Sequence, residues 1–441
     1  MACPITLAIA DAALSARLYL PADPNQQFWS QAERLLYLQE AIREWNALAA
    51  YWRGDFQFPS QANVAWYDLT TVVGTLRPVT LTPSLLYTII LYHLLEPPTG
   101  SVSAQFSATD LSNAVNQRLN ELLGTTGCFI THSTIPAAPG RTALAANTLD
   151  LRRLAFIPAM GFGSPSTLWE DDSWAWQAFE PNYTTMPPGI PSTYARSTQP
   201  VQTFDVDTNL NVPGTYELLT IENSLASPTS TIIPDDWAWV LKWGALAELL
   251  GRESNAKDPL RQQYCERRYA EGMSLLALAP ALLGMRVNNV PIEVDAVVSS
   301  DQYNTGWEST TPTAPTAALV AGLNLVALSP TPDSSLYTVS ATVVENAPVP
   351  SLSADCINVT EDVYEAILDE AQHLAMFKCG GAEFEATLAM HQRFLSLAAL
   401  YSSRIAEMGE FAQTLYKQSQ REAERHPRYT ADSPAEVTSG G

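Results

Sequence analysis

Apolar residues recur at helical spacing in several separate parts of the chain, most clearly between Ile233 and Leu276. There, residues three or four positions apart form one apolar face: Trp239, Trp243, Leu246 and Leu250. Gly251 is a typical helix end, and Asp258 followed by Pro259 is a typical helix start. We therefore predict a helical hairpin here, and nothing in its pattern resembles a catalytic group.

A second helical hairpin is predicted from Thr360 onward. Thr360 is a suitable N-cap, and Glu361 and Asp362 suit the first turn of a helix. The apolar face of this first helix is Val363, Ile367, Ala371 and Leu374. A turn at 379–381 leads to a long second helix, whose apolar positions are Phe384, Leu388, Leu395, Ala398, Ile405 and Met408.

The N-terminal part repeats one pattern twice. An amphipathic helix over 27–53 is followed by strand signals at 55–58 and 64–73. A helix that begins after Ser107 is followed by strand signals at 128–132 and 150–157. This pattern indicates an internal duplication.

Changes in composition divide the chain into five predicted segments. They are the helix–strand units (1–160), an aromatic loop with a strand pair and the central hairpin (161–283), a Pro/Thr/Val-rich β insertion or extended arm (284–352), the second hairpin (353–417) and a polar tail (418–441). The predicted fold class is α+β, with helical hairpin units, small antiparallel sheets and long Pro-rich loops.

The charge balance limits the classes of partner. The net charge is −22, with Lys+Arg 24 against Asp+Glu 46, and duplex-DNA binding needs clustered basic residues. An acidic wall is nevertheless compatible with a conduit through which DNA slides. No apolar run reaches membrane-span length, and the N-terminus lacks the features of a signal peptide.

The reactive residue types form no recognised motif. The five cysteines are scattered without a CxxC pair, which argues against a zinc site or a disulfide framework and favours a reducing compartment. Phosphate-binding glycine motifs, HExxH and GxSxG are absent. His373 and His391 fall on the two helices of the last hairpin and are in a position to meet. A structural role is expected for them rather than a metal site.

Two groups of residues each allow two interpretations, one functional and one purely structural. Glu170, Asp171 and Asp172 lie among aromatic residues, as in a carbohydrate-cleaving cleft, although adjacent acids usually form a solvated loop or helix start. The central hairpin carries a charged series that is either a solvated helix face or a contact between subunits of a ring. The residues predicted for subunit contacts are Arg261, Arg267, Arg268, Glu271, Trp169, Trp174 and Trp176.

The middle of the chain resembles the head-to-tail adaptor (connector) proteins of tailed bacteriophages. The resemblance lies in LDLRRLAFIP, GIPSTY, NVPGTYELLTI and IPDDWAWVLKWGALAELLGRESNAKDPLRQQYCERRYAEGM. The last hairpin, VTEDVYEAILDEAQHLAMFKCGGAEFEATLAMHQRFL, is similar to the same closing pair. These stretches cover about two fifths of the chain, and their motifs are patterns of packing and turns rather than reactive groups.

The resemblance implies a non-enzymatic virion protein at the head–tail junction, assembled in the host cytoplasm without a cofactor. Such adaptors form a ring, typically dodecameric, beneath the portal protein, carry the tail or neck proteins and let genomic DNA pass through the lumen. It also implies that the C-terminal tail docks the portal. The tail residues predicted for this contact are Arg421, Arg425, Arg428 and Tyr429. The alternative is a tail or baseplate protein with a glycan-binding or glycan-cleaving role in the Trp169–Phe179 loop.

Overall fold

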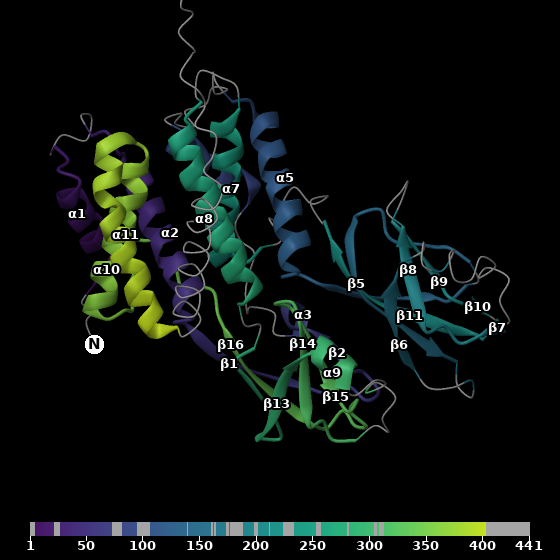
Figure 1. Ribbon diagram of the computed structural model, residues 1–441. Coiled ribbons are helices and arrows are strands. Elements are labelled where there is room, and N and C mark those ends of the chain that lie inside the picture. Colours follow the sequence, from purple (N-terminus) through teal and green to yellow (C-terminus); the bar gives the residue numbers. More distant parts are fainter. Residues whose placement is uncertain are drawn as a thin grey trace, which may run out of the picture.

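The computed structural model places helices in one layer and two β-sheets beside it (Figure 1). It describes residues 5–21, 27–72, 82–94, 106–138, 140–159, 162, 165–172, 176, 188–197, 202–210, 212–223, 233–252, 257–279, 282–303, 307 and 313–402. The predicted portal-docking residues Arg421, Arg425, Arg428 and Tyr429 lie outside these ranges, as does Trp174.

Helices from distant parts of the sequence share one hydrophobic core. They are α1 (Leu7–Arg17), α2 (Gln31–Ala49), α4 (Pro83–His93), α5 (Ala108–Thr126), α7 (Ala238–Gly251), α8 (Pro259–Ala277), α10 (Glu361–Phe377) and α11 (Gly381–Tyr401). Their starts follow from local chemistry. Ser107 and Asp110 form a capping box at α5, and Asp258 caps α8 with Pro259 in the first turn.

Two glycines allow α7 and α8 to pack closely. A Cβ added at Gly272 would lie 2.6 Å from Val240 Cγ2, and one at Gly244 would lie 2.7 Å from the Tyr269 ring. Neither distance is compatible with an unshifted neighbour, so both positions require glycine at this interhelical distance.

The first sheet is built on long strands near the middle of the chain. Its order is β3-β11-β5-β6-β8-β9-β4, with β6 and β8 parallel. Its strands are β3 (Thr131–Pro136), β4 (Thr142–Ala143), β5 (Thr148–Pro158), β6 (Ser166–Asp171), β8 (Thr193–Ser197), β9 (Thr203–Val206) and β11 (Gly214–Glu222). A short parallel pair, β7 (Pro188–Gly189) with β10 (Asn209–Leu210), is separate from this sheet.

The second sheet joins the N-terminal region to residues 284–344. Its order is β1-β16-β12-β13-β14-β15-β2, with β13 and β14 parallel. Its strands are β1 (Arg53–Pro59), β2 (Trp66–Asp68), β12 (Gly284–Val287), β13 (Val290–Ala296), β14 (Ala317–Ala321), β15 (Leu325–Ser329) and β16 (Thr338–Val344). Asn288 and Asn289, at φ 49° and 65°, make the tight turn between β12 and β13. Two short helices, α3 (Leu69–Val72) and α9 (Val297–Tyr303), continue directly from β2 and β13.

These sheets correct the predicted fold class. Each is seven-stranded, curled and mixed, so the prediction of small antiparallel sheets beside helical hairpins is wrong. The strand predicted over 64–73 is also too long, because 69–72 is helical. The segment 284–352 contributes strands to a sheet shared with β1 and β2, rather than standing alone.

Most of the described elements form two similarly built units, one nested in the other; α1 and α4 belong to neither. The inner unit (residues 106–279) contains α5, the first sheet and the hairpin α7–α8. The outer unit (residues 27–72 and 282–402) contains α2, the second sheet and the hairpin α10–α11. In each unit the leading helix packs against the closing hairpin. The predicted boundary at 160/161 lies within the first sheet, between β5 and β6.

Candidate functional site

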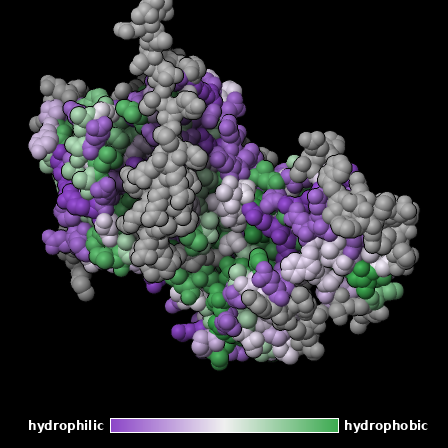
Figure 2. Space-filling model, viewed as in Figure 1, coloured by the Kyte–Doolittle hydropathy of each residue, from purple (hydrophilic) through white to green (hydrophobic). Residues whose placement is uncertain are grey.

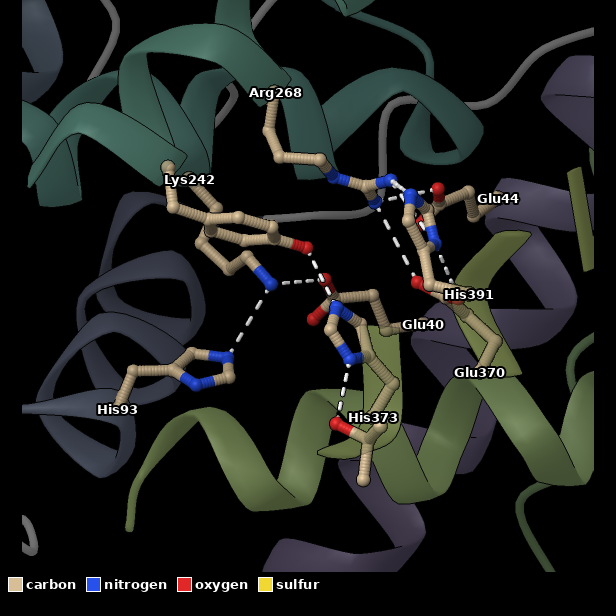
Figure 3. A network of polar contacts seen from close by, with 10 residues as sticks. Glu40, Glu44, His93, Lys242, Arg268, Glu370, His373 and His391 are labelled. Atoms are coloured by element: carbon tan, nitrogen blue, oxygen red, sulfur yellow. Dashed lines mark hydrogen bonds and ion pairs between the residues drawn. The ribbon is translucent and has the colours of Figure 1, made fainter. Parts of the chain in front are cut away.

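A chain of ionisable side chains runs through the interior of the helical layer, where the two units meet (Figure 3). Lys242 and Arg268 come from the inner unit, on α7 and α8. Glu40, Glu44 and Glu370 come from the outer unit, on α2 and α10. At most 8% of any of these five side chains is exposed. The network therefore sets three carboxyl groups against two cations inside a hydrophobic core.

Arg268 is the centre of one half of this network. Its Nη2 lies 2.6 Å from Glu44 Oε1 and 3.5 Å from Glu370 Oε1. Its Nη1 also contacts His391 Nε2. Because a guanidinium only donates, His391 Nε2 must accept, and Nδ1–H then donates to Glu370 Oε2 at 2.7 Å. The contacts thus fix a neutral His391 in one tautomer.

The tautomer of His373, which lies beside His391, can also be assigned from its hydrogen-bond partners. Its Nδ1 lies 2.9 Å from Thr387 Oγ1, whose hydroxyl donates to the Phe384 carbonyl at 2.7 Å. His373 Nδ1–H must therefore donate, and Tyr264 Oη donates to Nε2 at 2.6 Å. The His373 and His391 rings stack with centroids 5.0 Å apart. The two histidines placed on facing helices by the sequence do meet, as stacked neutral rings.

Lys242 forms the other half of the network. Its ammonium contacts Glu40, lies 3.3 Å from His93 Nε2 and sits 3.8 Å from the Trp243 ring centroid. Burial lowers the pKa of Lys242, and burial lowers the pKa of His93 well below its usual range. Both shifts have the same cause, because desolvation disfavours the charged form of a base.

Burial acts in the opposite direction on the carboxyl groups. It raises the pKa of Glu44 to about 8 and that of Glu370 to about 7, although Arg268 opposes both shifts. Lys242 and Arg268 thus face three carboxyl groups, and burial favours the protonated form of Glu44 and Glu370.

The same carboxyl groups satisfy the geometric criteria for a metal site. Ligand atoms of Glu44, Glu370 and His391 all lie within 4.8 Å of one another. Arg268, however, is bonded to all three of these residues. A metal ion would have to displace the guanidinium and leave it buried without its counter-ions, so we assign the cationic role here to Arg268.

A second polar network joins the units where the sheets meet. Arg153 of β5 binds Asp301 of α9 at 2.7 Å and Glu217 of β11 at 3.0 Å. Trp66 Nε1 donates to Glu217 and Trp307 Nε1 to Asp301, both at 3.0 Å. The Arg153 guanidinium also lies over both indole rings. Inner-unit Arg153 and Glu217 are thus held to outer-unit Trp66, Asp301 and Trp307.

A cleft of about 450 Å³ opens beside this second network. Residues of both units line it, including Arg152, Thr167, Trp169, Glu170, Val298 and Asp301. Trp169 is 49% exposed, whereas the other tryptophans that the structure describes are buried or half-buried.

The residues predicted for subunit contacts are distributed unevenly. Arg268 is 2% exposed and bound within its own chain, so its assignment to a subunit surface is wrong. Trp176 is 8% exposed and packs inside the chain, which also removes it from that surface. Arg261 is tied to Asp258 at 2.7 Å. Three other residues of the predicted set are accessible: Arg267, Glu271 and Trp169.

The acids beside the tryptophans do not face one another across a cleft. Glu170 binds Arg196 at 2.5 Å, and Asp171 accepts from Trp176 Nε1 at 2.9 Å. Both acids belong to β6, where successive side chains point to opposite faces. The pair therefore lacks the facing arrangement that glycoside cleavage uses.

No protein-family model matches the chain, and no curated protein matches its sequence. Of the helices in the described ranges, none is long and apolar enough to cross a membrane.

Cys356 is disulfide-bonded, whereas Cys128, Cys265 and Cys379 are free thiols. The disulfide at Cys356 is an exception to the prediction that the scattered cysteines form no disulfide framework.

Proposed function

We propose that the chain is a structural virion protein, a non-enzymatic head-to-tail adaptor that associates with copies of itself into a ring beneath the portal. The proposal starts from the resemblance in the α7–α8 hairpin. One feature of the fold supports it: four accessible residues lie in line along the solvent-facing side of α8.

This line of residues, the α8 stripe, has an apolar residue at each end and an ion pair between them. Leu260 is 77% exposed and Leu278, just beyond the helix, is 55% exposed. Arg267 Nε lies 3.8 Å from Glu271 Oε1 between them. At 100° per residue these four positions fall within about 40° of one another around the helix axis. Two exposed leucines in line with an ion pair form a surface of mixed apolar and charged character, as interfaces between proteins have.

The side of α8 that faces the core is held by buried hydrogen bonds. Such a fixed helix suits a contact that is repeated between identical subunits. Arg268 and Tyr264 anchor α8 to α2 and α10 through buried bonds, so the stripe is presented at a fixed angle. A ring closes only when every subunit offers its contact surfaces in the same relative orientation.

Mass photometry of the purified protein, alone and with portal, tests the proposal. Leu260→Asp combined with Leu278→Asp is expected to shift the distribution from ring to monomer, because two charges would be buried at the contact. Leu336→Asp is the matched control, since Leu336 is 85% exposed and belongs to the connection between β15 and β16. A protein that stays monomeric with and without portal would refute the adaptor function.

Portal docking by the C-terminal tail stays a prediction from sequence, because residues 418–441 lie outside the described part of the chain. Truncation after Lys417 is expected to abolish portal binding while leaving the ring intact. Unchanged portal binding by the truncated chain would reject docking through Arg421, Arg425, Arg428 and Tyr429.

A further inference from the structure

We propose that the cleft between the two sheets is a binding site for an uncharged saccharide, with Trp169 as its stacking platform. This site is separate from the α8 stripe and does not depend on ring formation. The inference rests on three features of the cleft: its exposed aromatic ring, its matched charges and its mixed polar and apolar walls.

The aromatic ring is the first feature. Trp169 is on β6 of the inner unit, and its backbone is fixed by pairing with Thr193 of β8. About half of its side chain is exposed, although the indole is a large apolar surface that a fold normally covers. Val298 of α9, in the outer unit, lines the same cleft and is 67% exposed. Both units thus contribute uncovered apolar surface.

The charges lining the cleft are the second feature. Arg152 lies 2.9 Å from Asp150, and Arg153 lies 2.7 Å from Asp301. Glu170 is paired with Arg196. Since each charge already has a partner within the chain, the cleft gives neither an anion nor a cation an electrostatic advantage. A phosphate or carboxylate ligand would also meet the carboxylates of Glu170 and Asp301.

The third feature is that both polar and apolar groups line the cleft. The half-exposed Arg152 guanidinium and Glu170 carboxylate provide donors and acceptors beside the apolar surface. A wholly apolar ligand would cover these groups without replacing their contacts with water, at a cost in free energy. A sugar ring has C–H faces that stack on an indole and hydroxyl edges that bond to such groups. The cleft volume of about 450 Å³ also lies within the range of small-molecule sites, roughly 300–1,000 Å³.

A panel of neutral, sialylated and sulfated oligosaccharides, titrated against the full-length protein by calorimetry, tests the proposal. We expect binding of neutral members, weakened about tenfold or more by Trp169→Ala. Arg152→Met is expected to weaken binding to a smaller extent, because it removes an accessible donor from the cleft wall. Tyr19→Ala is the matched control, because Tyr19 is 93% exposed and lies outside the cleft. Thermal unfolding of each variant checks that the fold is retained.

Affinity electrophoresis through gels that contain a neutral polysaccharide tests whether the ligand is a sugar residue within a polymer or a free saccharide. Retardation there, relieved by Trp169→Ala, assigns the site to a residue within a polymer, whereas binding of short oligosaccharides alone assigns it to free saccharides. Binding of only the anionic glycans, no binding by any glycan, or binding that survives Trp169→Ala would overturn the proposal. Mass photometry of Trp169→Ala distinguishes a failure here from a failure of ring formation.

Discussion

Replacing Glu44 with glutamine is expected to stabilise the protein at alkaline pH, although it removes a buried ion pair. Glu44 Oε1 accepts from Arg268, while Oε2 has no hydrogen-bond partner among the described residues. The glutamine oxygen can keep the bond to Arg268, and its amide group occupies the place of Oε2. Glu44→Gln therefore imitates the protonated acid, which the excess of carboxyl groups in the network favours.

The direction and size of the effect follow from proton linkage. The pKa of Glu44 is about 8 in the folded protein, against an ordinary value of 4.5. A raised carboxyl pKa stabilises the fold fully below pH 4.5, and this contribution disappears as the pH rises to about 8. Each pH unit within that window costs about 1.4 kcal/mol. Between pH 5 and pH 7 the wild type should lose on the order of 2 kcal/mol relative to Glu44→Gln.

Chemical denaturation of both proteins at pH 5, 6, 7 and 8 measures this difference. We expect nearly equal unfolding free energies at pH 5 and a growing advantage for Glu44→Gln above it. Glu385→Gln, on the exposed side of α11, should differ little from wild type at any of these pH values. If Glu44→Gln were less stable than wild type by the same amount at every pH, Glu44 would be ionised throughout and the argument would fail.

Three further predictions concern other parts of the fold. Gly272→Ala should destabilise the α7–α8 contact by about 1–3 kcal/mol because its Cβ meets Val240, whereas Gly124→Ala, with open space around it, should be neutral or stabilising; melting curves compare them. Arg153→Met should cost about 3–5 kcal/mol by leaving Asp301 buried without its cation, and hydrogen exchange should accelerate in β6 and α9; unchanged exchange would contradict this. Burial lowers the pKa of each of the three histidines in the helical network, so their contribution to stability is present above about pH 6.5 and lost as the pH falls. Replacing them together with glutamine should flatten the acid limb of a stability–pH curve, and an unchanged limb would argue against it.

The helices could be predicted from sequence because their signals are local. The start of α8 is specified by Asp258 and Pro259, and α2 lies within the predicted range 27–53. Sheet size could not be predicted in this way. Strand β1 pairs with β16, and the register of Asp55 with Thr342 depends on contacts between segments far apart in the chain. Strand periodicity indicates which residues face a core but does not identify the partner strand.

The buried charges show a second limit of sequence patterns. Lys242 lies between Trp239 and Trp243 in an apolar helix, and that context was a usable signal that it is buried. Its partner Glu40, on α2, gave no comparable signal, because a glutamate on an amphipathic helix usually faces solvent. Trp169 could likewise be noticed as an aromatic residue beside acids, but its exposure depends on how the two sheets meet.

The nested arrangement has a consequence for synthesis on the ribosome. Asp55 and Thr342 hydrogen bond across β1 and β16 although 287 residues separate them. At roughly 5–20 residues per second, β1 emerges roughly 15–60 s before its partner strand exists. Throughout that interval Phe56 and Phe58 belong to a strand whose partner β16 has not yet been synthesised. The inner unit is contiguous in sequence and can already fold. A nascent chain of this design leaves apolar strand residues exposed throughout that interval, and slower translation would lengthen it.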